Sequence, residues 1–310
     1  MDDKLNLGRI GYLNVLPVYF PLESGIVSHP FSIVAGTPAY LNELAARGAL
    51  DISPVSSIEY ARHADLYYIV PDLSISSFGE VKSVLLLSRR PVEQLGERKI
   101  LVTPQSHTSV GLLKVLSKMR YEMDPVFETG APADFSANGG GPEAFLAIGD
   151  EALRLNGKRM FPHVLDLGTA WYEWTGLPFV FALWVVRKKA VDEKNGRIPA
   201  AVKALLDSKR WGCSYIERIC EEAARAGVLE IDELHEYYRC LRYDLNERER
   251  RGLELFYSCL RQVGELERVP KLEIYSAGGC RVSGAGEGRK AEDGCGSTEG
   301  LARECSISGL

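Results

Sequence analysis

Two long apolar stretches decide the fold of this chain: VKSVLLLSRRP at residues 81–91 and PFVFALWVVRKK at residues 178–189. Each is rich in the branched and aromatic side chains that favour strands. About 100 residues separate them. A chain that enters a second lobe by one long strand and returns by another produces this pattern. We therefore predict a hinged molecule with one lobe at residues 1–86 plus 188–275, a second at 87–187, and a cleft between them.

The sequence around these stretches alternates between strand and helix patterns. LNLGRI at 5–10 is followed by a helical pattern at 16–22, and FSIVAGTP at 31–38 is followed by YLNELAARG at 40–48. A second such series begins near Arg98, and the pattern from Pro199 to about Val269 is almost wholly helical. This alternation predicts an α/β fold with two mostly parallel sheets joined by two crossing strands.

Composition excludes several classes of protein. The net charge of −5 over 310 residues argues against a nucleic-acid footprint. Apolar runs are shorter than the roughly 20 residues of a membrane span, and the N-terminus lacks the pattern of a signal peptide. We expect a cytoplasmic protein, with monomer and homodimer both left open. The seven cysteines form no CxxC pair, so we predict no metal site. Residues 276–310 hold nine of the thirty glycines and no aromatic residue, which predicts a disordered tail.

Polar turns follow several predicted strands, at the sheet edge where α/β proteins bind ligands. They contain Gly11, Tyr12 and Asn14; Ser56 and Ser57; Ser74, Ser76 and Ser77, with Ser83 in the first long stretch; and Ser106, His107, Thr108 and Ser109. Hydroxyl and amide groups at helix starts suit carboxylate or phosphate groups. Together these turns predict a cleft lined by neutral donors that holds a small, oxygen-rich anion.

Each candidate residue also has a purely structural interpretation. Asn14 and Asp150 are suited to helix N-caps, and a buried serine such as Ser83 can bond to the backbone. His107 is either an acid or base, or a surface residue beside a cap. The aromatic residues Trp171, Tyr172 and Trp174 either wall a pocket or pack a lobe. Arg9 either adds charge to the cleft, faces solvent or braces the sheet.

Several motifs, in order along the chain, resemble the menaquinone-pathway chorismate dehydratase family. They are GRIGYLNVLPVY at 8–19, SPVSSIEYAR at 53–62, PDLSISSFGEVKSVLLLS at 71–88, SHTSVGLL at 106–113, IGDEAL at 148–153 and TGLPFVFALW at 175–184. The resemblance spans about residues 5–275. It implies the two-lobed fold of type II periplasmic binding proteins. It also implies that chorismate loses water to give 3-[(1-carboxyvinyl)oxy]benzoate, without a metal or organic cofactor.

The resemblance also implies roles for individual residues. The functionally important Asn and Ser of the family pattern match Asn14 and Ser83, which we expect to be catalytic. The SxTS turn matches Ser106, Thr108 and Ser109 as substrate contacts. Further substrate contacts are expected at Gly11, Tyr12, Ser56, Ser57 and Asp150. Because an amide cannot take up a proton and a serine needs an activator, our hypothesis makes a substrate carboxylate the base.

Two other functions remain open at this point. One is a cytoplasmic binding or sensor protein on the same fold, because fold alone does not fix function. The other is the related dihydroxynaphthoate synthase of the same pathway.

Overall fold

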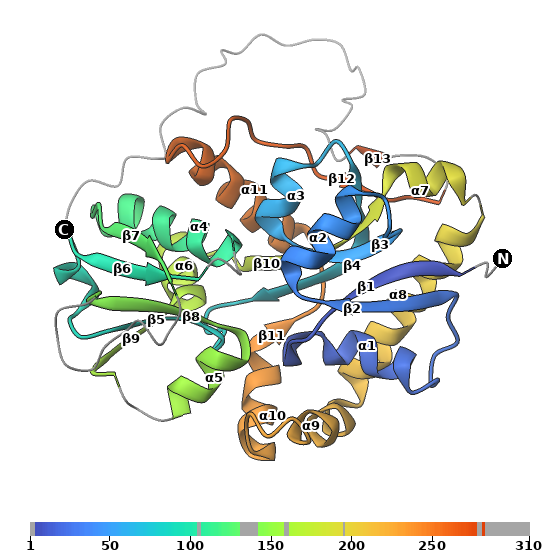
Figure 1. The fold of residues 1–310 in the computed structure, drawn as a ribbon, viewed down its shortest axis with the longest axis horizontal. Helices are drawn as coiled ribbons and strands as arrows, with labels where there is room; N and C mark the ends of the chain where they lie inside the picture. The colour runs from blue at the N-terminus through green and yellow to red at the C-terminus, as the bar shows by residue number, and fades with distance from the viewer. Residues whose placement is uncertain are drawn as a thin grey trace, which may run out of the picture.

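The computed structural model describes residues 4–103, 107–130, 142–157, 161–194, 196–277 and 281–282. Two sheets lie side by side, each flanked by helices (Figure 1). The large sheet has the order β13-β12-β4-β10-β3-β1-β2, with β11 beside β4. Its strands are β1 Leu5–Ile10, β2 Phe31–Gly36, β3 Ile52–Ser56, β4 Tyr67–Ser77, β10 Phe179–Arg187, β11 Leu241–Arg242, β12 Glu273–Ile274 and β13 Arg281–Val282.

The small sheet has the order β7-β6-β8-β5-β9. Its strands are β5 Val84–Ser88, β6 Lys99–Val102, β7 Val126–Thr129, β8 Ala144–Ile148 and β9 His163–Asp166. The helices are α1 Leu16–Glu23, α2 Pro38–Ala46, α3 Ser57–Arg62, α4 His107–Val115, α5 Gly149–Gly157, α6 Leu167–Thr175, α7 Lys188–Glu193, α8 Arg197–Ser214, α9 Ile216–Ala224, α10 Ile231–Cys240 and α11 Glu247–Gln262. Short turns are η1 Leu13–Val15, η2 Val92–Gln94 and η3 Leu116–Arg120. The α/β class with two sheets is thus confirmed.

The sheets are mixed, so the expectation of mostly parallel sheets was wrong. β1 pairs in parallel with β2 and β3, and β6 does so with β7 and β8. However, β10 runs antiparallel to β3 and β4, and β5 runs antiparallel to β8 and β9. The reason lies in the crossings. Strands such as β3 and β8 end toward the other sheet, whereas β5 and β10 each begin there and run away from it.

The chain changes sheet before each of the two long apolar stretches. β4 belongs to the large sheet and β5 to the small one, so the first crossing lies between Ser77 and Val84. The return lies between Asp166 and Phe179, because β10 pairs only within the large sheet over the described residues. The predicted lobe limits, 1–86 plus 188–275 and 87–187, therefore cut the chain later than the sheets do. The division into lobes stays a prediction.

Aromatic packing joins the return crossing to the large sheet. Trp171 on α6 is fully buried and lies edge-on to Trp174, Phe179 and Phe256, with ring centroids 5.4–5.9 Å apart. Tyr172, at the surface, meets the ring of Phe78. These contacts support the packing interpretation of the aromatic cluster, because they link α6, β10 and α11.

Further predictions from the sequence concern the helical region, membrane-spanning helices, the cysteines and the C-terminal tail. The helical region from Pro199 onward forms α8 to α11. No helix in the described part is long and apolar enough to cross a membrane. Cys213, Cys220, Cys240 and Cys259 form no disulfide bond with one another, and no metal-ligating cluster occurs among the described residues. The predicted disordered tail lies outside the described residues except for 276–277 and for 281–282, which form β13.

Candidate functional site

A cavity opens between the two sheets and encloses about 970 Å³, including its solvent-open mouth. It is lined at the ends of β1, β3 and β8, at the beginnings of β5 and β10, and at the first turns of α2, α4 and α5. The lining residues are Ile10, Tyr12, Asn14, Pro38, Ala39, Asn42, Ser56, Ile75, Val81, Ser83, Val84, His107, Thr108, Ser109, Ile148, Gly149, Phe181, Ala182 and Leu241. The polar turns expected from the sequence therefore converge on one space.

Asn14 lies inside the turn η1 and faces this cavity. Its side chain caps neither η1, which begins after Tyr12, nor α1, which begins after Val15, so the cap interpretation was wrong. The backbone around it is held by Tyr238, whose hydroxyl donates to the Leu13 carbonyl, and by Tyr243, whose hydroxyl donates to the Asn14 carbonyl, at 2.9 and 2.8 Å. The Asn14 Oδ1 atom is buried without a hydrogen-bond partner among the described residues. Such an atom is free to bind a ligand.

Ser83 faces the cavity from the other side, immediately before β5. The residue is 3% exposed. Its Oγ accepts a hydrogen bond from the Tyr237 hydroxyl and donates to the Val81 carbonyl, both at 3.3 Å. Both bonds are long for two oxygen atoms, and a ligand in the cavity can compete with the Val81 carbonyl for the Ser83 proton.

Some hydroxyl groups at the starts of α3 and α4 line the cavity, and others support the residues that line it. Ser56 lines the cavity and also caps α3, accepting from the Glu59 N–H. Thr108 and Ser109 line it from the first turn of α4. Ser57 is fully buried behind them, with its Oγ 3.3 Å from Thr108 Oγ1. The structure thus brings three of these four residues to the cavity, while Ser106 lies outside the described residues.

The serines of β4 have structural roles instead. Ser74 and Ser76 donate to the carbonyls of Asp244 and Arg242, and Ser77 donates to the Gly79 carbonyl. The hydroxyl protons of these three serines are therefore already donated to backbone carbonyls of the protein. Of this strand, Ile75 lines the cavity.

Asp150 bridges the two sheets rather than lining the cavity. Its Oδ1 accepts the Leu13 N–H at 3.2 Å, which ties the start of α5 to η1. Burial raises the pKa of this carboxyl above its ordinary value, although the Leu13 bond lowers it. Beside it, Tyr12 lines the cavity, and burial together with Asp150 raises the pKa of its phenol. Gly11 is exposed and does not line the cavity.

The described lining residues of the cavity include no lysine or arginine. Arg9 points elsewhere, to an ion pair with Glu23 at 2.6 Å and the face of Tyr19, so its bracing role holds. Positive potential comes instead from helix starts. α2, α4 and α5 each place first-turn residues, namely Pro38, His107 and Gly149, on the cavity wall. Free N–H groups and the helix dipole favour negative charge there.

The chain is similar in sequence to several known proteins. The sequence model of a family described as "Menaquinone biosynthesis" matches residues 5–262. A chorismate dehydratase from Thermus thermophilus is 33% identical over 276 residues, covering 82% of this chain and 94% of the relative. The chain belongs to this menaquinone biosynthesis family. Another relative, a chorismate dehydratase from Campylobacter jejuni, is 31% identical over 190 residues, covering 59% of this chain and 69% of the relative.

Solved structures relate the fold of this family member to that of periplasmic binding proteins. A protein from Archaeoglobus fulgidus superposes with a TM-score of 0.66 at 18% identity, covering 84% of this chain and 98% of the other. The periplasmic aliphatic sulphonate binding protein of Escherichia coli gives 0.63 at 15% identity, covering 96% and 98%. At these identities the likeness shows the fold alone. It confirms the expected periplasmic-binding-protein-like architecture.

Proposed function

We propose that this protein is a chorismate dehydratase, a carbon–oxygen lyase that converts chorismate to 3-[(1-carboxyvinyl)oxy]benzoate and water. The observation that carries the proposal is the meeting of two groups in one cavity. The unpartnered amide oxygen of Asn14 comes from the large sheet, and the hydroxyl of Ser83 comes from the first crossing. These are the two residues that the family resemblance marks as catalytic.

The chemistry asks for orientation more than for strong acids or bases. Chorismate carries two carboxylates, an enol ether and a ring hydroxyl. Loss of the ring proton beside the ether, with departure of the neighbouring hydroxyl, makes the ring aromatic and supplies much of the driving force. Fixing reacting groups in the productive geometry contributes up to about 7–11 kcal/mol in favourable cases. A cavity of neutral, well-placed groups is therefore sufficient for much of the rate enhancement.

In this proposal a substrate carboxylate removes the ring proton, and the protein holds the partners in place. The Asn14 amide orients the substrate, and Ser83 donates a hydrogen bond to the departing hydroxyl. The abstracted ring proton passes from the substrate carboxylate to this hydroxyl, which leaves as water. The helix starts at α2 and α4 stabilise the two carboxylates. His107 is the imidazole among the described lining residues, and a base on the protein would be sought there first.

The other residues predicted to contact the substrate differ in where they lie relative to the cavity. Tyr12, Ser56, Thr108 and Ser109 line the cavity and are proposed to bind the substrate directly. Ser57 and Asp150 support them from behind, through Thr108 and through Leu13. Gly11 and Ser106 remain predictions from the family pattern. The absence of a metal or organic cofactor, the cytoplasmic location and the choice between monomer and homodimer remain predictions as well.

The alternative is a protein that binds a small anion without converting it, which the fold shared with a sulphonate binding protein favours. Incubation of the purified protein with chorismate separates the two functions. Chromatography and mass spectrometry would detect a product lighter than chorismate by one water. Chorismate recovered unchanged, together with a raised thermal unfolding midpoint in its presence, would establish binding and overturn the dehydratase proposal.

A further inference from the structure

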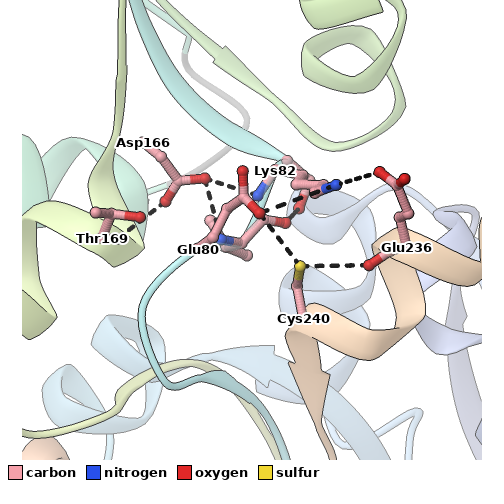
Figure 2. A network of polar contacts seen from close by, with 8 residues as sticks. Glu80, Lys82, Asp166, Thr169, Glu236 and Cys240 are labelled. Carbon is pink, nitrogen blue, oxygen red and sulfur yellow. Dashed lines mark hydrogen bonds and ion pairs between the residues drawn. The ribbon is translucent and has the colours of Figure 1, made fainter. Parts of the chain in front are cut away.

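The first crossing and helix α10 meet through two adjacent pairs of residues. Lys82 Nζ lies 2.8 Å from Glu236 Oε2, and in the next position of both segments the Tyr237 hydroxyl donates to Ser83 Oγ at 3.3 Å. Figure 2 shows the first of these pairs, with Cys240 of the next helical turn beside Glu80. α10 is therefore fixed in register against the crossing, and the Tyr237 side chain is directed at Ser83.

The backbone before Ser83 is held from the small-sheet side. Lys82 adopts a positive φ of 60°, a conformation that costs a non-glycine residue free energy. Asp166, at the end of β9, offsets this cost because its Oδ2 accepts the N–H groups of Val81 and Lys82 at 3.0 and 2.7 Å (Figure 2). Its Oδ1 accepts the Thr169 N–H and caps α6. The Cα position of Ser83 is thus set by the fold, and what remains free is the direction of its hydroxyl proton.

Tyr237 determines that direction. A serine hydroxyl has one proton to donate and lone pairs to accept with. Tyr237 is 1% exposed, and burial raises the pKa of its phenol well above the ordinary value of 10.0, so the phenol keeps its proton throughout the neutral range. In the structure the Tyr237 hydroxyl is the donor and Ser83 Oγ the acceptor of this bond, while Ser83 Oγ donates to the Val81 carbonyl. Its own proton then points away from Tyr237, toward the Val81 carbonyl in the free protein or toward a ligand.

We propose that Tyr237 is a positioning residue that presents the Ser83 hydroxyl as a hydrogen-bond donor to the cavity. Tyr237 does not line the cavity, so it acts through Ser83. The inference rests on the proposed function, because it assigns the oriented proton to the hydroxyl that leaves chorismate. Without the phenol, the Ser83 proton has a second direction open to it, and a smaller fraction of molecules donates to the leaving group.

The test compares Tyr237→Phe with a matched control, Tyr60→Phe. Tyr60 is another buried tyrosine, and its hydroxyl donates to the Lys271 carbonyl at 2.8 Å, away from the cavity. For Tyr237→Phe we expect kcat with chorismate to fall about tenfold and KM to change less than about twofold, the order expected for one oriented hydrogen bond used in the transition state. Tyr60→Phe should keep both constants. Both variants are assayed below the lower of their thermal unfolding midpoints, so that loss of fold does not enter the comparison.

Three results would count against the inference. Wild-type kcat in Tyr237→Phe would overturn it, and so would an equal fall in kcat in Tyr60→Phe, because the effect would then follow from losing any buried phenol. A change confined to KM would show that Tyr237 serves binding rather than the oriented proton. If the wild-type protein itself leaves chorismate unchanged, the proposed function fails and this inference fails with it.

Discussion

Asn14 combines its proposed role in the site with a cost in stability. Its buried Oδ1 has no partner among the described residues, and an unsatisfied buried acceptor costs on the order of 1–3 kcal/mol. A residue that serves only the fold would not be retained as an amide here, because an apolar side chain of similar size would avoid this cost. The position is therefore one at which function and stability are expected to oppose each other.

The substitution Asn14→Leu tests this opposition. Because it removes the unsatisfied oxygen while keeping side-chain volume, we expect the free energy of unfolding to rise by up to about 1–3 kcal/mol. Dehydration of chorismate should fall below detection in the same variant. Urea unfolding and product analysis on one preparation provide the measurement. A variant that is destabilised, or that still turns over chorismate at the wild-type rate, would contradict the account of this residue.

Asp150 gives a pH dependence whose sign follows from its burial. Its pKa in the folded protein is raised above the ordinary value of 3.8, chiefly by desolvation. The carboxyl thus binds its proton more tightly when folded, so its contribution to stability is fully present at low pH and is lost as pH rises through the raised pKa. In Asp150→Asn this titration is absent, while an oxygen that can accept the Leu13 N–H is kept.

We therefore expect the free energy of unfolding of the wild type, minus that of Asp150→Asn, to increase as pH falls through the acidic range toward 3.8. Denaturant unfolding at several pH values measures this difference. A difference that is independent of pH, or one that grows with rising pH, would show that the Asp150 carboxyl is not disfavoured in its charged form.

At the scale of elements, the first crossing is the segment that the fold holds most closely beside the site. Asp166 accepts three backbone N–H groups, from Val81, Lys82 and Thr169, and is itself largely buried. On the opposite wall, α10 leads directly into β11. Residues of α10 and of the segment after β11 hold the backbone of this wall. There Tyr238 and Tyr243 bond the carbonyls of Leu13 and Asn14. Both catalytic candidates are thus placed by hydrogen bonds from elements distant in sequence.

Replacing Asp166 by alanine should loosen the crossing. Three N–H groups lose their acceptor, and we expect a loss of about 1–3 kcal/mol in the free energy of unfolding together with reduced dehydratase activity. Asp207→Ala on α8 is the control, because Asp207 pairs with Lys203 at the protein surface, where such pairs contribute less than about 1 kcal/mol. Equal stability changes in the two variants, measured by urea unfolding, would refute the holding role of Asp166.

The sequence patterns predict elements better than they predict pairing direction. Strand and helix periodicity locates β1, α1, β2 and α2 close to their observed bounds, since each is decided by local residues. The antiparallel course of β5 and β10 depends on which sheet the chain enters, and a buried strand reads the same in either direction. For the same reason local patterns do not reveal the residue at which the chain passes from one sheet to the other.

At the scale of the whole molecule, some residues of the cavity wall cannot be recognised from local sequence patterns. Asn14, Ser56, Thr108 and Ser109 were predicted because polar residues in turns after strands are conspicuous, and Ser83 because it is a hydroxyl in an otherwise apolar run. Asn42 sits on an ordinary amphipathic helix, and Phe181 lies within a continuous apolar strand. Nothing in the surrounding sequence marks such residues as lining, because only the packing of the two sheets exposes them to a common space.

Gly149 is a residue whose type and position in the sequence indicate a close approach between two segments of backbone. It adopts a positive φ of 58°, and a Cβ built there would lie 3.0 Å from Tyr12 Cε1 of the other sheet. A glycine between the end of β8 and the acidic first turn of α5 is a place where the backbone can approach a neighbour closely. Together with the Asp150 bond to Leu13, this contact brings the two sheets together at one side of the cavity.

The central claim is that Asn14 and Ser83, brought together across this cavity, dehydrate chorismate. The most direct measurement is one time course of chorismate consumption and product formation by the wild type, Asn14→Ala and Ser83→Ala, with the affinity of each protein for chorismate determined alongside. The account predicts one water lost per chorismate with the wild type. Both variants should still bind chorismate but form little or no product. Product formation at the wild-type rate by either variant would contradict the claim.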